Sequence, residues 1–356
     1  MTGSAESPSE LAPTPSALGF RMPAEWEPHE ATWLSWPRPD GISFPDSYDR
    51  VVLTLAAMVH ALGASEKVYI NVCDAEHEAL VRTQLAKARA KADHVTFFQI
   101  PINEPWCRDH GPIFVTREED PKLAVLDWGY NAWGWKYPPF EDDDAVPIRI
   151  AEKLGLPIYT PGMVLEGGSI DVNGAGTLLT TKSCLLNPNR NPELKQKEIE
   201  ERLCAYLGVR HVLWLGDGIE GDDTDGHIDD ITRFVDRTAV VTVVEEDAND
   251  ANHDPLQANL ELLRTMEAED GSPLAIHTLP MPRKIVRDGQ RLPASYANFY
   301  IGNKVVLLPV FRDPHDKWAI AVLQKAFPTR KIIPIDCREL IWGLGAFHCL
   351  TQQLPA

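Results

Sequence analysis

A cysteine and a histidine that stand far apart in the sequence have the types needed for nucleophilic catalysis. Cys349 follows a glycine-containing stretch, GLGAFH at positions 343–348, and such a stretch can bring backbone close to a ligand. A cysteine nucleophile needs a histidine that converges on it in the fold, and His227 is a candidate. On residue type alone, Cys349 could equally be an inert packed cysteine.

Asp229 lies two residues after His227, in the segment GHIDD at positions 226–230. If this segment is a strand, the two side chains point to the same face of a sheet. A histidine and a carboxylate on one face could act as a general acid/base beside a group that binds a cation. The alternative is a solvated acidic turn.

Two further carboxylates, Asp109 and Glu166, stand beside tryptophan and glycine residues. Asp109 lies in WCRDHGP at positions 106–112, and Glu166 precedes two glycines. Each could simply stabilise a turn. Trp106 opens the first segment and belongs with the tryptophans at 128, 133 and 135, which are mostly expected in the core. Near a site, such rings could form an apolar wall or a cation–π face for a charged substrate.

The acidic segment at positions 222–230 does not fit a calcium-binding loop. When Asp223 and Asp225 are set at the third and fifth positions of an EF-hand, Gly221 and Thr232 fall where acidic ligands are needed. An HExxH helix is also absent from the sequence. We therefore expect no catalytic metal and no other cofactor.

The elements that must position these residues form a repeated unit, an amphipathic helix followed by a short β-rich run. The predicted helices span 51–62, 76–91, 144–154, 193–207, 256–266 and 315–327. The strands that follow them span 68–72, 95–100, 157–160, 211–215, 274–279 and 331–335. Gly155 and Gly208 directly follow two of the helices, as left-handed C-terminal caps do.

The candidate residues follow these strands in equivalent places. Asp109, Glu166, the pair of His227 and Asp229, and Cys349 each come in the loop after such a strand, and the loop after 274–279 contains Asn298. Five equivalent modules with reactive loops favour an α/β fold closed into a propeller-like ring around a central site. A doubly wound open sheet is the alternative, but no glycine-rich phosphate loop follows the first strand.

Composition limits the class of protein. The 356 residues include 34 Lys and Arg against 52 Asp and Glu, a formal charge of −18, with 44% hydrophobic and 24% charged residues. This is ordinary globular composition, and the acidic balance argues against nucleic acid and suits a small cationic partner. Residues 1–19, rich in Ser, Pro and Ala, are predicted to be a flexible tail, and 20–356 a single catalytic domain.

The expected compartment is the cytoplasm. The six cysteines are scattered without a CxxC pair, which argues against a disulfide scaffold or a zinc ribbon. No apolar run approaches the ~18 residues that would suggest a membrane span. The first 20 residues hold no Lys or Arg and no apolar segment typical of a signal peptide. A homo-oligomer is possible but is not readable from the sequence.

Several motifs in order make the chain similar to the agmatine deiminase and bacterial-type peptidylarginine deiminase family, within the guanidino-group-modifying pentein superfamily. The resemblance runs from Met22 to Gln353. The motifs are MPAEWEPHEATWLSWP, WCRDHGP, LEGGSIDVNG, NPNRNP, DTDGHIDD, SYANFYI and HCLTQQ. One departure is the nucleophile loop, GLGAFHC, where a run closer to three glycines would be expected.

The resemblance implies a five-bladed α/β propeller that hydrolyses a guanidinium to a ureido group and ammonia without a metal. It implies that Cys349 is the nucleophile and His227 the general acid/base. Asp109 and Asp229 would bind the guanidinium, and Glu166 would hold the neighbouring nitrogen or orient the histidine.

Trp106 and Asn298 are also predicted to bind the substrate, together with the two aspartates. The leading hypothesis is an agmatine deiminase that makes N-carbamoylputrescine for putrescine and polyamine synthesis. A deiminase that converts peptidyl- or free arginine to citrulline is the alternative. Free arginine needs a cation for its α-carboxylate, and Arg108 and Arg190 are the candidates.

Three other functions remain open on the sequence. An amidinotransferase would use the same thiouronium intermediate with an amine as acceptor. A catalytically silent guanidine-binding protein would keep the carboxylates without needing Cys349. A metallohydrolase is the most distant possibility, and insensitivity to EDTA would exclude it.

Overall fold

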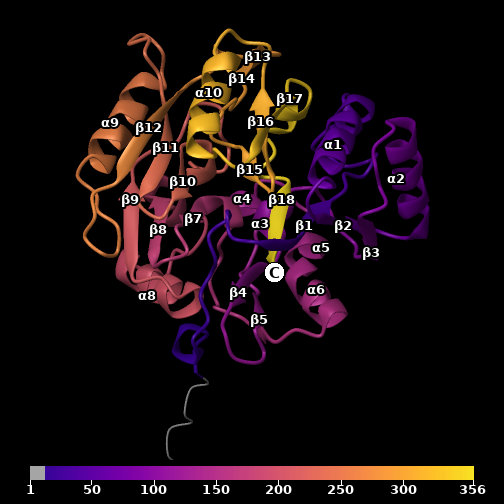
Figure 1. Cartoon of the computed structure of the whole chain (residues 1–356), viewed down its shortest axis with the longest axis horizontal. Coiled ribbons are helices and arrows are strands. Elements are labelled where there is room, and N and C mark those ends of the chain that lie inside the picture. The colour runs from indigo at the N-terminus through magenta and orange to yellow at the C-terminus, as the bar shows by residue number, and fades with distance from the viewer. Residues whose placement is uncertain (1–12) are drawn as a thin grey trace, which may run out of the picture.

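The computed structural model describes residues 13–356, which form an α/β fold built from five mixed sheets (Figure 1). Every one of the five sheets has the same internal order. Its first strand is antiparallel to the second, and the second is parallel to the third. In each of the five sheets a helix directly precedes the last strand, as the repeated helix–strand unit in the sequence predicts.

The first sheet joins the two ends of the described chain, because its strand order is β18 (Thr351–Pro355), β1 (His29–Ser35), β2 (Lys67–Val72) and β3 (Val95–Gln99). The second sheet is β4 (Ile113–Thr116), β5 (Leu123–Leu126) and β6 (Ile158–Tyr159). The third is β7 (Ile170–Val172), β8 (Thr177–Thr181) and β9 (His211–Leu215).

The fourth sheet is β10 (Thr232–Asp236), β11 (Ala239–Val244) and β12 (Ala275–Pro280). The fifth is β15 (Tyr300–Ile301), β16 (Val305–Val310) and β17 (Lys331–Asp336). A short hairpin of β13 (Val286–Arg287) and β14 (Gln290–Arg291) stands between these two sheets in the chain.

The six predicted helices are confirmed, each directly ahead of the strand predicted to follow it. They are α1 (Tyr48–Leu62), α2 (Ala75–Lys87), α6 (Val146–Leu154), α8 (Gln196–Leu207), α9 (His253–Leu263) and α10 (Asp316–Ala326). Gly155 and Gly208 end α6 and α8 with φ angles of 66° and 68°, the left-handed caps expected of them. The shorter helices are α3 (Cys107–His110), α4 (Ala132–Trp135), α5 (Glu141–Asp144) and α7 (Lys182–Leu185).

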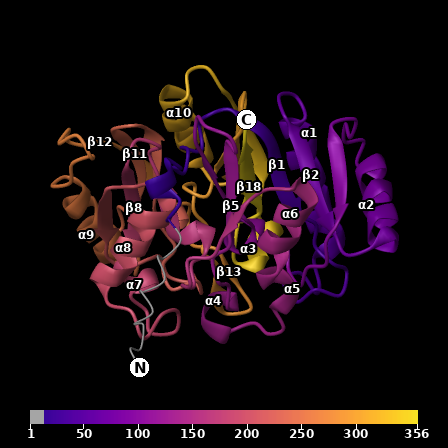
Figure 2. The ribbon, with the colours of Figure 1, turned by 90° about the horizontal axis from the view of Figure 1, so that it is seen from below.

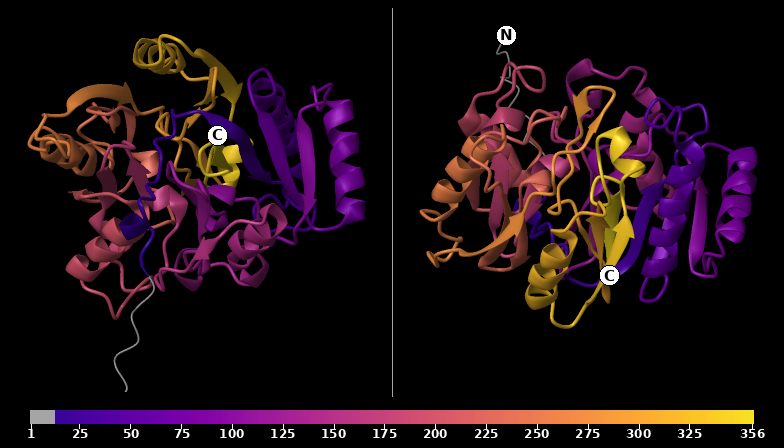
Figure 3. Two further views of the ribbon diagram at one scale, coloured as in Figure 1. Left: turned by 60° about the horizontal axis from the view of Figure 1, so that its bottom comes forward. Right: turned by 90° about the horizontal axis from the view of Figure 1, so that it is seen from above.

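Helices α1 and α2 lie at one side of the molecule and α9 at the opposite side (Figures 1 and 2). The yellow C-terminal segment lies between the indigo and orange regions in both views of Figure 3. Buried hydrophobic side chains form three clusters between the sheets and their helices. None of the helices in the described part of the chain combines the length and the apolar character needed to cross a bilayer.

The predicted tail needs a correction at its C-terminal end. Ser16–Leu18 form a short 3₁₀ helix, η1, which packs against α8, and the carbonyl of Leu18 accepts a hydrogen bond from Arg117 at 3.0 Å. Phe20, the residue after the capping Gly19, is 2% exposed. Residues 13–19 are therefore folded onto the body because a neighbouring helix covers them, and residues 1–12 of the predicted tail lie outside the described chain.

Candidate active site

Five loops connect the last strand of one sheet to the first strand of the next, and the predicted residues lie in these five loops. The loop from β3 to β4 carries Asp109, that from β6 to β7 carries Glu166, and that from β9 to β10 carries His227 and Asp229. The loop from β12 to β15 carries Asn298, and the loop from β17 to β18 carries Cys349. The equivalence predicted for these loops is confirmed.

Gly168 shows how closely three of these side chains approach each other. A Cβ atom added to this glycine would lie 2.6 Å from Nδ1 of His227 and 2.7 Å from Oδ1 of Asp109. It would lie 3.1 Å from Oδ2 of Asp229. Only a residue without a side chain fits at this point, which explains why the second residue after Glu166 is a glycine.

Cys349 is buried and is held mainly by Asn298. The Asn298 amide donates to the Cys349 sulfur at 3.1 Å, and its Oδ1 accepts from the backbone N–H groups of His348 and Cys349 at 3.0 and 3.4 Å. Oδ2 of Asp229 lies 3.7 Å from the same sulfur. Asn298 is fully buried, and its amide is engaged with the protein, so its geometry suits an anchor of the nucleophile loop.

The environment of Cys349 disfavours its thiolate. Burial raises the pKa of the Cys349 thiol well above its usual value, and the negative charges of Asp229, Asp230 and Asp109 raise it further. The thiol is therefore the resting form of the nucleophile.

His227 precedes a short 3₁₀ helix, η3 (Ile228–Asp230), so the strand expected for residues 227–229 is wrong. The helical turn nevertheless brings the His227 ring and the Asp229 carboxylate to the same place beside Gly168. Nδ1 of His227 lies 3.7 Å from Oδ1 of Asp109, and within residues 13–356 neither ring nitrogen has a hydrogen-bond partner. Both ring nitrogens are therefore unpaired among the described residues, as a group that exchanges protons with a substrate requires.

The charge state of His227 follows from its acidic neighbours. Burial opposes the charged form, but the carboxylate of Asp109, the Cys184 sulfur and Asp229 together raise the pKa of His227 well above its usual value. The ring is thus an imidazolium, the form that can donate a proton to a leaving group.

Asp109 is fixed by two hydrogen bonds. Its Oδ2 accepts from the indole of Trp133 at 3.0 Å, and its Oδ1 accepts from the backbone N–H of Gly168 at 2.9 Å. Burial raises the pKa of Asp109 to about 6; His227 opposes this rise, and Asp229 and Glu166 reinforce it. Trp133 lies in α4, where its φ angle of 55° and those of the adjacent residues are left-handed. This strained turn aims the indole at Asp109.

Asp229 and Glu166 each keep one carboxylate oxygen unused. Oδ2 of Asp229 lies 2.7 Å from Nδ1 of His348, and Oε1 of Glu166 accepts from the Arg190 guanidinium at 2.6 Å. The other two oxygens are buried and have no partner among the described residues. Burial favours the neutral acid of Asp229, but the hydrogen bond and charge of His348 hold the pKa of this carboxyl below its usual value. A cation with N–H groups would satisfy both free oxygens.

Arg108 and Arg190, the candidates for binding an α-carboxylate, are both engaged in buried pairs. The Arg190 guanidinium contacts Glu166 and Asp225 and donates to the carbonyl of Thr224 at 2.9 Å. The Arg108 guanidinium donates to Gln353 at 2.8 Å and to Glu25 at 3.4 Å. Each guanidinium therefore holds a buried carboxylate in place, and neither leaves a pair of N–H groups free to bind a substrate carboxylate.

A cavity of about 400 Å³ leads to Cys349 and Asp109. The rings of Trp106 and Trp133 form part of its wall, and its lining includes the carboxylates of Glu104 and Asp223. Among the described residues that line it there is no lysine, arginine or histidine. The full lining is Ile42, Ser43, Pro45, Glu104, Trp106, Asp109, Trp133, Tyr137, Asp223, Thr224, Trp342, Gly343, Leu344, Gly345 and Cys349.

The nucleophile loop packs tightly on Trp106. A Cβ on Gly345 would lie 2.5 Å from this indole, whose Nε1 donates to the Ser43 hydroxyl at 3.0 Å. Leu344 has a φ angle of 69°, in the left-handed region that favours glycine. The departure from a three-glycine run therefore puts a leucine at a position where glycine would be unstrained, and this leucine lines the cavity.

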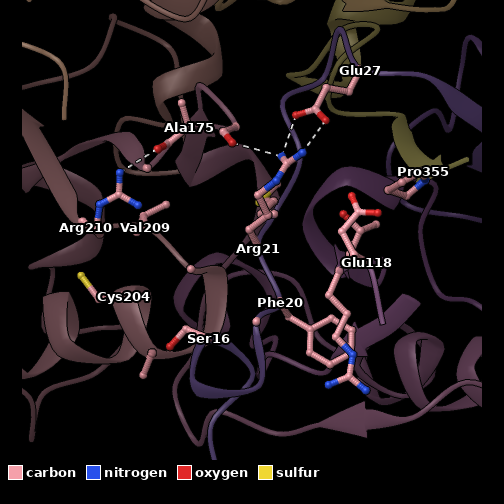
Figure 4. A pocket seen from close by; sticks show the side chains of 18 of the residues that line it. Ser16, Phe20, Arg21, Glu27, Glu118, Ala175, Cys204, Val209, Arg210 and Pro355 are labelled. Atoms are coloured by element: carbon pink, nitrogen blue, oxygen red, sulfur yellow. Dashed lines mark hydrogen bonds and ion pairs between the residues drawn. The ribbon is translucent and has the colours of Figure 1, made fainter. Parts of the chain in front are cut away.

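A larger hollow of about 1250 Å³ shares no lining residue with this cavity (Figure 4). Arg21 extends along it and is paired with Glu27 at 2.7 Å, and Arg210 donates to the carbonyl of Ala175 at 3.1 Å. None of the predicted reactive residues lines this hollow. The cavity at Cys349 is therefore the candidate active site.

The described residues include one cluster with metal-ligand types, Glu166, Cys184 and His227, whose ligand atoms lie within 4.8 Å of each other. Metal ligands must be deprotonated. Burial raises the pKa of Cys184, and the pKa of His227 is raised by its acidic neighbours. Glu166 is already paired with Arg190. This cluster does not fit a resident cation, so the mechanism uses none.

Two titratable residues in contact with this site, His348 and Glu25, are not among those predicted from the sequence. His348 bridges Asp229 and Glu25. The position of His348 directly before Cys349 is a signal that could have found it, because a titratable group there must lie near the nucleophile. Glu25 gives no such signal, since it lies more than 300 residues away in the chain.

The profile of Porphyromonas-type peptidyl-arginine deiminases matches residues 21–355, nearly the whole chain. The chain belongs to this family. Similar family members include the agmatine deiminase of Pseudomonas aeruginosa, 39% identical over 96% of this chain and 97% of that protein. The agmatine deiminase of Ectopseudomonas mendocina is 38% identical over 97% and 98% of the two chains. The structure of an Enterococcus faecalis agmatine deiminase superposes with a TM-score of 0.90 at 35% identity, covering 97% and 98%.

Proposed function

We propose that this chain hydrolyses agmatine to N-carbamoylputrescine and ammonia through a covalent thiouronium on Cys349. The observation that carries the proposal is the small cavity at Cys349, which is lined by carboxylates and by none of the cationic residues among those described. A substrate with a cation at each end suits such a cavity. The agmatine deiminases named above, which resemble the chain over nearly its full length, also support it.

Free arginine suits the cavity less well because its α-carboxylate would need a cation. Arg108 and Arg190 are both bound to buried carboxylates, and neither lines the cavity. Moving either one to a substrate would leave a buried charge without a partner, which typically costs about 3–5 kcal/mol. Agmatine lacks the carboxylate and makes no such demand.

The guanidinium is planar and permanently charged, and the two aspartates can receive its N–H groups. We assign Asp109 and Asp229 to this role, with the unpaired Oδ1 of Asp229 directed to the substrate. The free Oε2 of Glu166 would hold a neighbouring nitrogen. This grip would fix the guanidinium carbon in reach of the Cys349 sulfur, and fixing geometry is itself a large contribution to rate. Trp106 and Trp133 would form the walls around the alkyl chain.

In the first half of the reaction the bound guanidinium favours loss of the Cys349 thiol proton to solvent, because His227 is already protonated. The resulting thiolate forms a bond to the guanidinium carbon. The tetrahedral adduct then breaks one C–N bond, and His227 gives its proton to the departing nitrogen, which leaves as ammonia. In the second half, neutral His227 takes a proton from water, whose oxygen attacks the same carbon. Cleavage of the C–S bond releases the ureido product, and the hydroxyl proton of the adduct passes to the sulfur, which restores the Cys349 thiol.

We expect the substrate's own charge to promote the thiolate. The pKa of Cys349 is raised by burial and by three aspartates, and a bound guanidinium opposes those negative charges. Saturation with a non-hydrolysed guanidine should lower the thiol pKa by about 1–3 units, the usual effect of a nearby opposite charge. The measurement is the ultraviolet absorbance of the thiolate against pH, taken as the difference between the wild type and Cys349→Ser. An unchanged thiol pKa on ligand binding would reject substrate-assisted activation.

We further propose that the five sheets are the blades of an α/β propeller and that residues 20–356 act as one catalytic domain. Contacts between first strands of neighbouring sheets, β18 with β4 and β7 with β10, support this arrangement. The site also draws residues from five successive inter-sheet loops. The cytoplasm is the proposed compartment because all six cysteines are free. Homo-oligomerisation stays a prediction.

The proposed function is tested by ammonia release from agmatine, a peptidyl-arginine and free arginine in parallel, with Cys349→Ser as the control. Release from agmatine alone, with formation of the ureido product, is the expected result. Release only from the arginine compounds would keep the mechanism but contradict the substrate. Transfer of an amidino group to an added amine would indicate an amidinotransferase, and loss of activity in EDTA would indicate a metallohydrolase.

A further inference from the structure

His348 lies between two buried carboxylates. Its Nδ1 is 2.7 Å from Oδ2 of Asp229, and its Nε2 is 2.8 Å from Oε2 of Glu25. The His348 residue is 2% exposed, so water does not replace either partner. Both ring nitrogens are thus committed to acidic oxygens, one on the substrate side of the ring and one on the far side.

Both carboxylates are ionised, so the ring must donate at both ends. Glu25 accepts from the Arg233 guanidinium at 2.9 Å and from the backbone N–H of Ile301 at 2.7 Å. Although burial favours the neutral acid, the charge of Arg233, the contact with His348 and the charge of Arg108 hold the pKa of Glu25 well below its usual value. An ionised carboxylate only accepts hydrogen bonds. A ring that donates to both carboxylates needs two N–H groups, which is the cationic form of histidine.

A cationic His348 ring would lie beside a site that contains several acidic side chains. Asp229, Asp230 and Asp109 surround the nucleophile, and all three are buried. The contact with His348 uses Oδ2 of Asp229 and leaves Oδ1 unpaired. The ring thereby fixes the rotation of the carboxylate as well as its charge.

We propose that His348 is a positioning residue that holds Asp229 ionised and turns its free oxygen toward the guanidinium, with Glu25 as the counter-charge that keeps the ring protonated. This inference rests on the proposed function. In this arrangement His348 and Glu25 lie behind Asp229, on the side away from the substrate. The contact of Glu25 with His348 also connects the segment before β1 to the nucleophile loop.

Other charged groups face this triad from every side and must be considered in any pH dependence. Arg108 and Arg233 contact Glu25, and Arg233 also pairs with Asp171. On the substrate side the neighbours of Asp229 include His227 and Asp230. The arginines stay charged at all working pH values, so the groups that can titrate in the acid range are the carboxylates.

The test is His348→Gln, assayed for turnover of agmatine across pH. Glutamine can donate to only one of the two carboxylates and has no charge. We expect kcat/KM to fall by about 100-fold at neutral pH, the size of loss that follows a misplaced reacting geometry. The wild-type acid limb should follow Asp109, whose pKa burial raises to about 6.

In the variant, Asp229 loses the cation that keeps it ionised and joins Asp109 in taking up a proton. The acid limb should therefore become steeper and move to higher pH by about one unit. A purely structural role would lower activity equally at all pH values, and an acid limb unchanged in position and steepness would overturn the proposal. His77→Gln is the matched control, because His77 is another buried histidine whose ring contacts only backbone groups, and it should leave the acid limb unchanged.

A second measurement does not depend on folding of the variant or on turnover. NMR of the ring nitrogens of His348, in selectively labelled Cys349→Ser protein at neutral pH, should show both nitrogens protonated with and without agmatine. A neutral ring would overturn the proposal even if the enzyme is active. Failure of the proposed function is distinguished from this result, because it would appear as wild-type protein without ammonia release from agmatine.

Discussion

Replacement of Cys349 by serine is expected to abolish ammonia release while the protein stays folded and still binds agmatine. The serine hydroxyl can keep the contacts to Asn298 and Asp229 that the thiol makes. It cannot form the thiouronium, because a hydroxyl is a far weaker nucleophile than a thiolate without a strong base beside it. We expect a loss of at least about 10⁴-fold in kcat, in line with removal of other covalent nucleophiles.

The measurement is kcat for agmatine, paired with calorimetric binding of agmatine to the variant. Wild-type protein quenched during turnover should show the covalent adduct on Cys349 by mass spectrometry. Cys204→Ser is the control, since Cys204 is a half-buried cysteine outside the cavity, and it should keep wild-type turnover. An active Cys349→Ser protein would refute the covalent route.

The second large effect is expected from removal of either guanidinium-binding aspartate. Asp109→Ala would leave the Trp133 indole and the Gly168 N–H without their acceptor, and Asp229→Ala would leave the charged His348 facing an empty space. Breaking a buried ion pair costs about 3–5 kcal/mol. A cost of this size corresponds to a loss on the order of 10²–10³-fold or more in kcat/KM.

Each aspartate variant is tested by kcat/KM and, in the Cys349→Ser background, by agmatine affinity. Asp143→Asn is the matched control. Asp143 is also buried, does not line the cavity, and accepts the backbone N–H groups of Asn103 and Glu104, which an asparagine oxygen can still accept. This control should keep activity near that of the wild type. If Asp109→Ala or Asp229→Ala protein kept the wild-type affinity and turnover, the assignment of these aspartates to guanidinium binding would be contradicted.

The α/β class and the loops that carry the five candidate residues could be predicted from the sequence because both depend on a local repeat. Each helix–strand unit is encoded in consecutive residues by hydrophobic period and by terminal glycines such as Gly155 and Gly208. Asp109, Glu166 and Cys349 could be recognised because each follows the same element of its own module. Loops that occupy the same position in each repeated unit come together in the fold. Their residues can therefore be recognised without knowledge of the tertiary structure.

Local sequence patterns do not predict the backbone at two places where contacts with distant residues determine it. The segment at 227–229 forms a 3₁₀ turn, and its side chains converge through the close approach allowed by Gly168. Residues 13–19 have a composition typical of a tail, yet η1 folds against α8. In both cases the contacts come from a segment that is distant in the sequence, Gly168 in the first case and α8 in the second. A local sequence pattern gives no information about such a segment.

The sequence by itself determined which residue types stand in which loops, and therefore the class of chemistry. Only the tertiary structure decided their charge states and their partners. The thiol form of Cys349 follows from burial and from nearby carboxylates, and the imidazolium of His227 follows from carboxylates of separate loops that outweigh its burial. The ion pair of Arg190 with Glu166 and the bridge from Glu25 through His348 depend equally on packing. Protonation and pairing are set by distance and burial, and these quantities exist only after distant segments have come together.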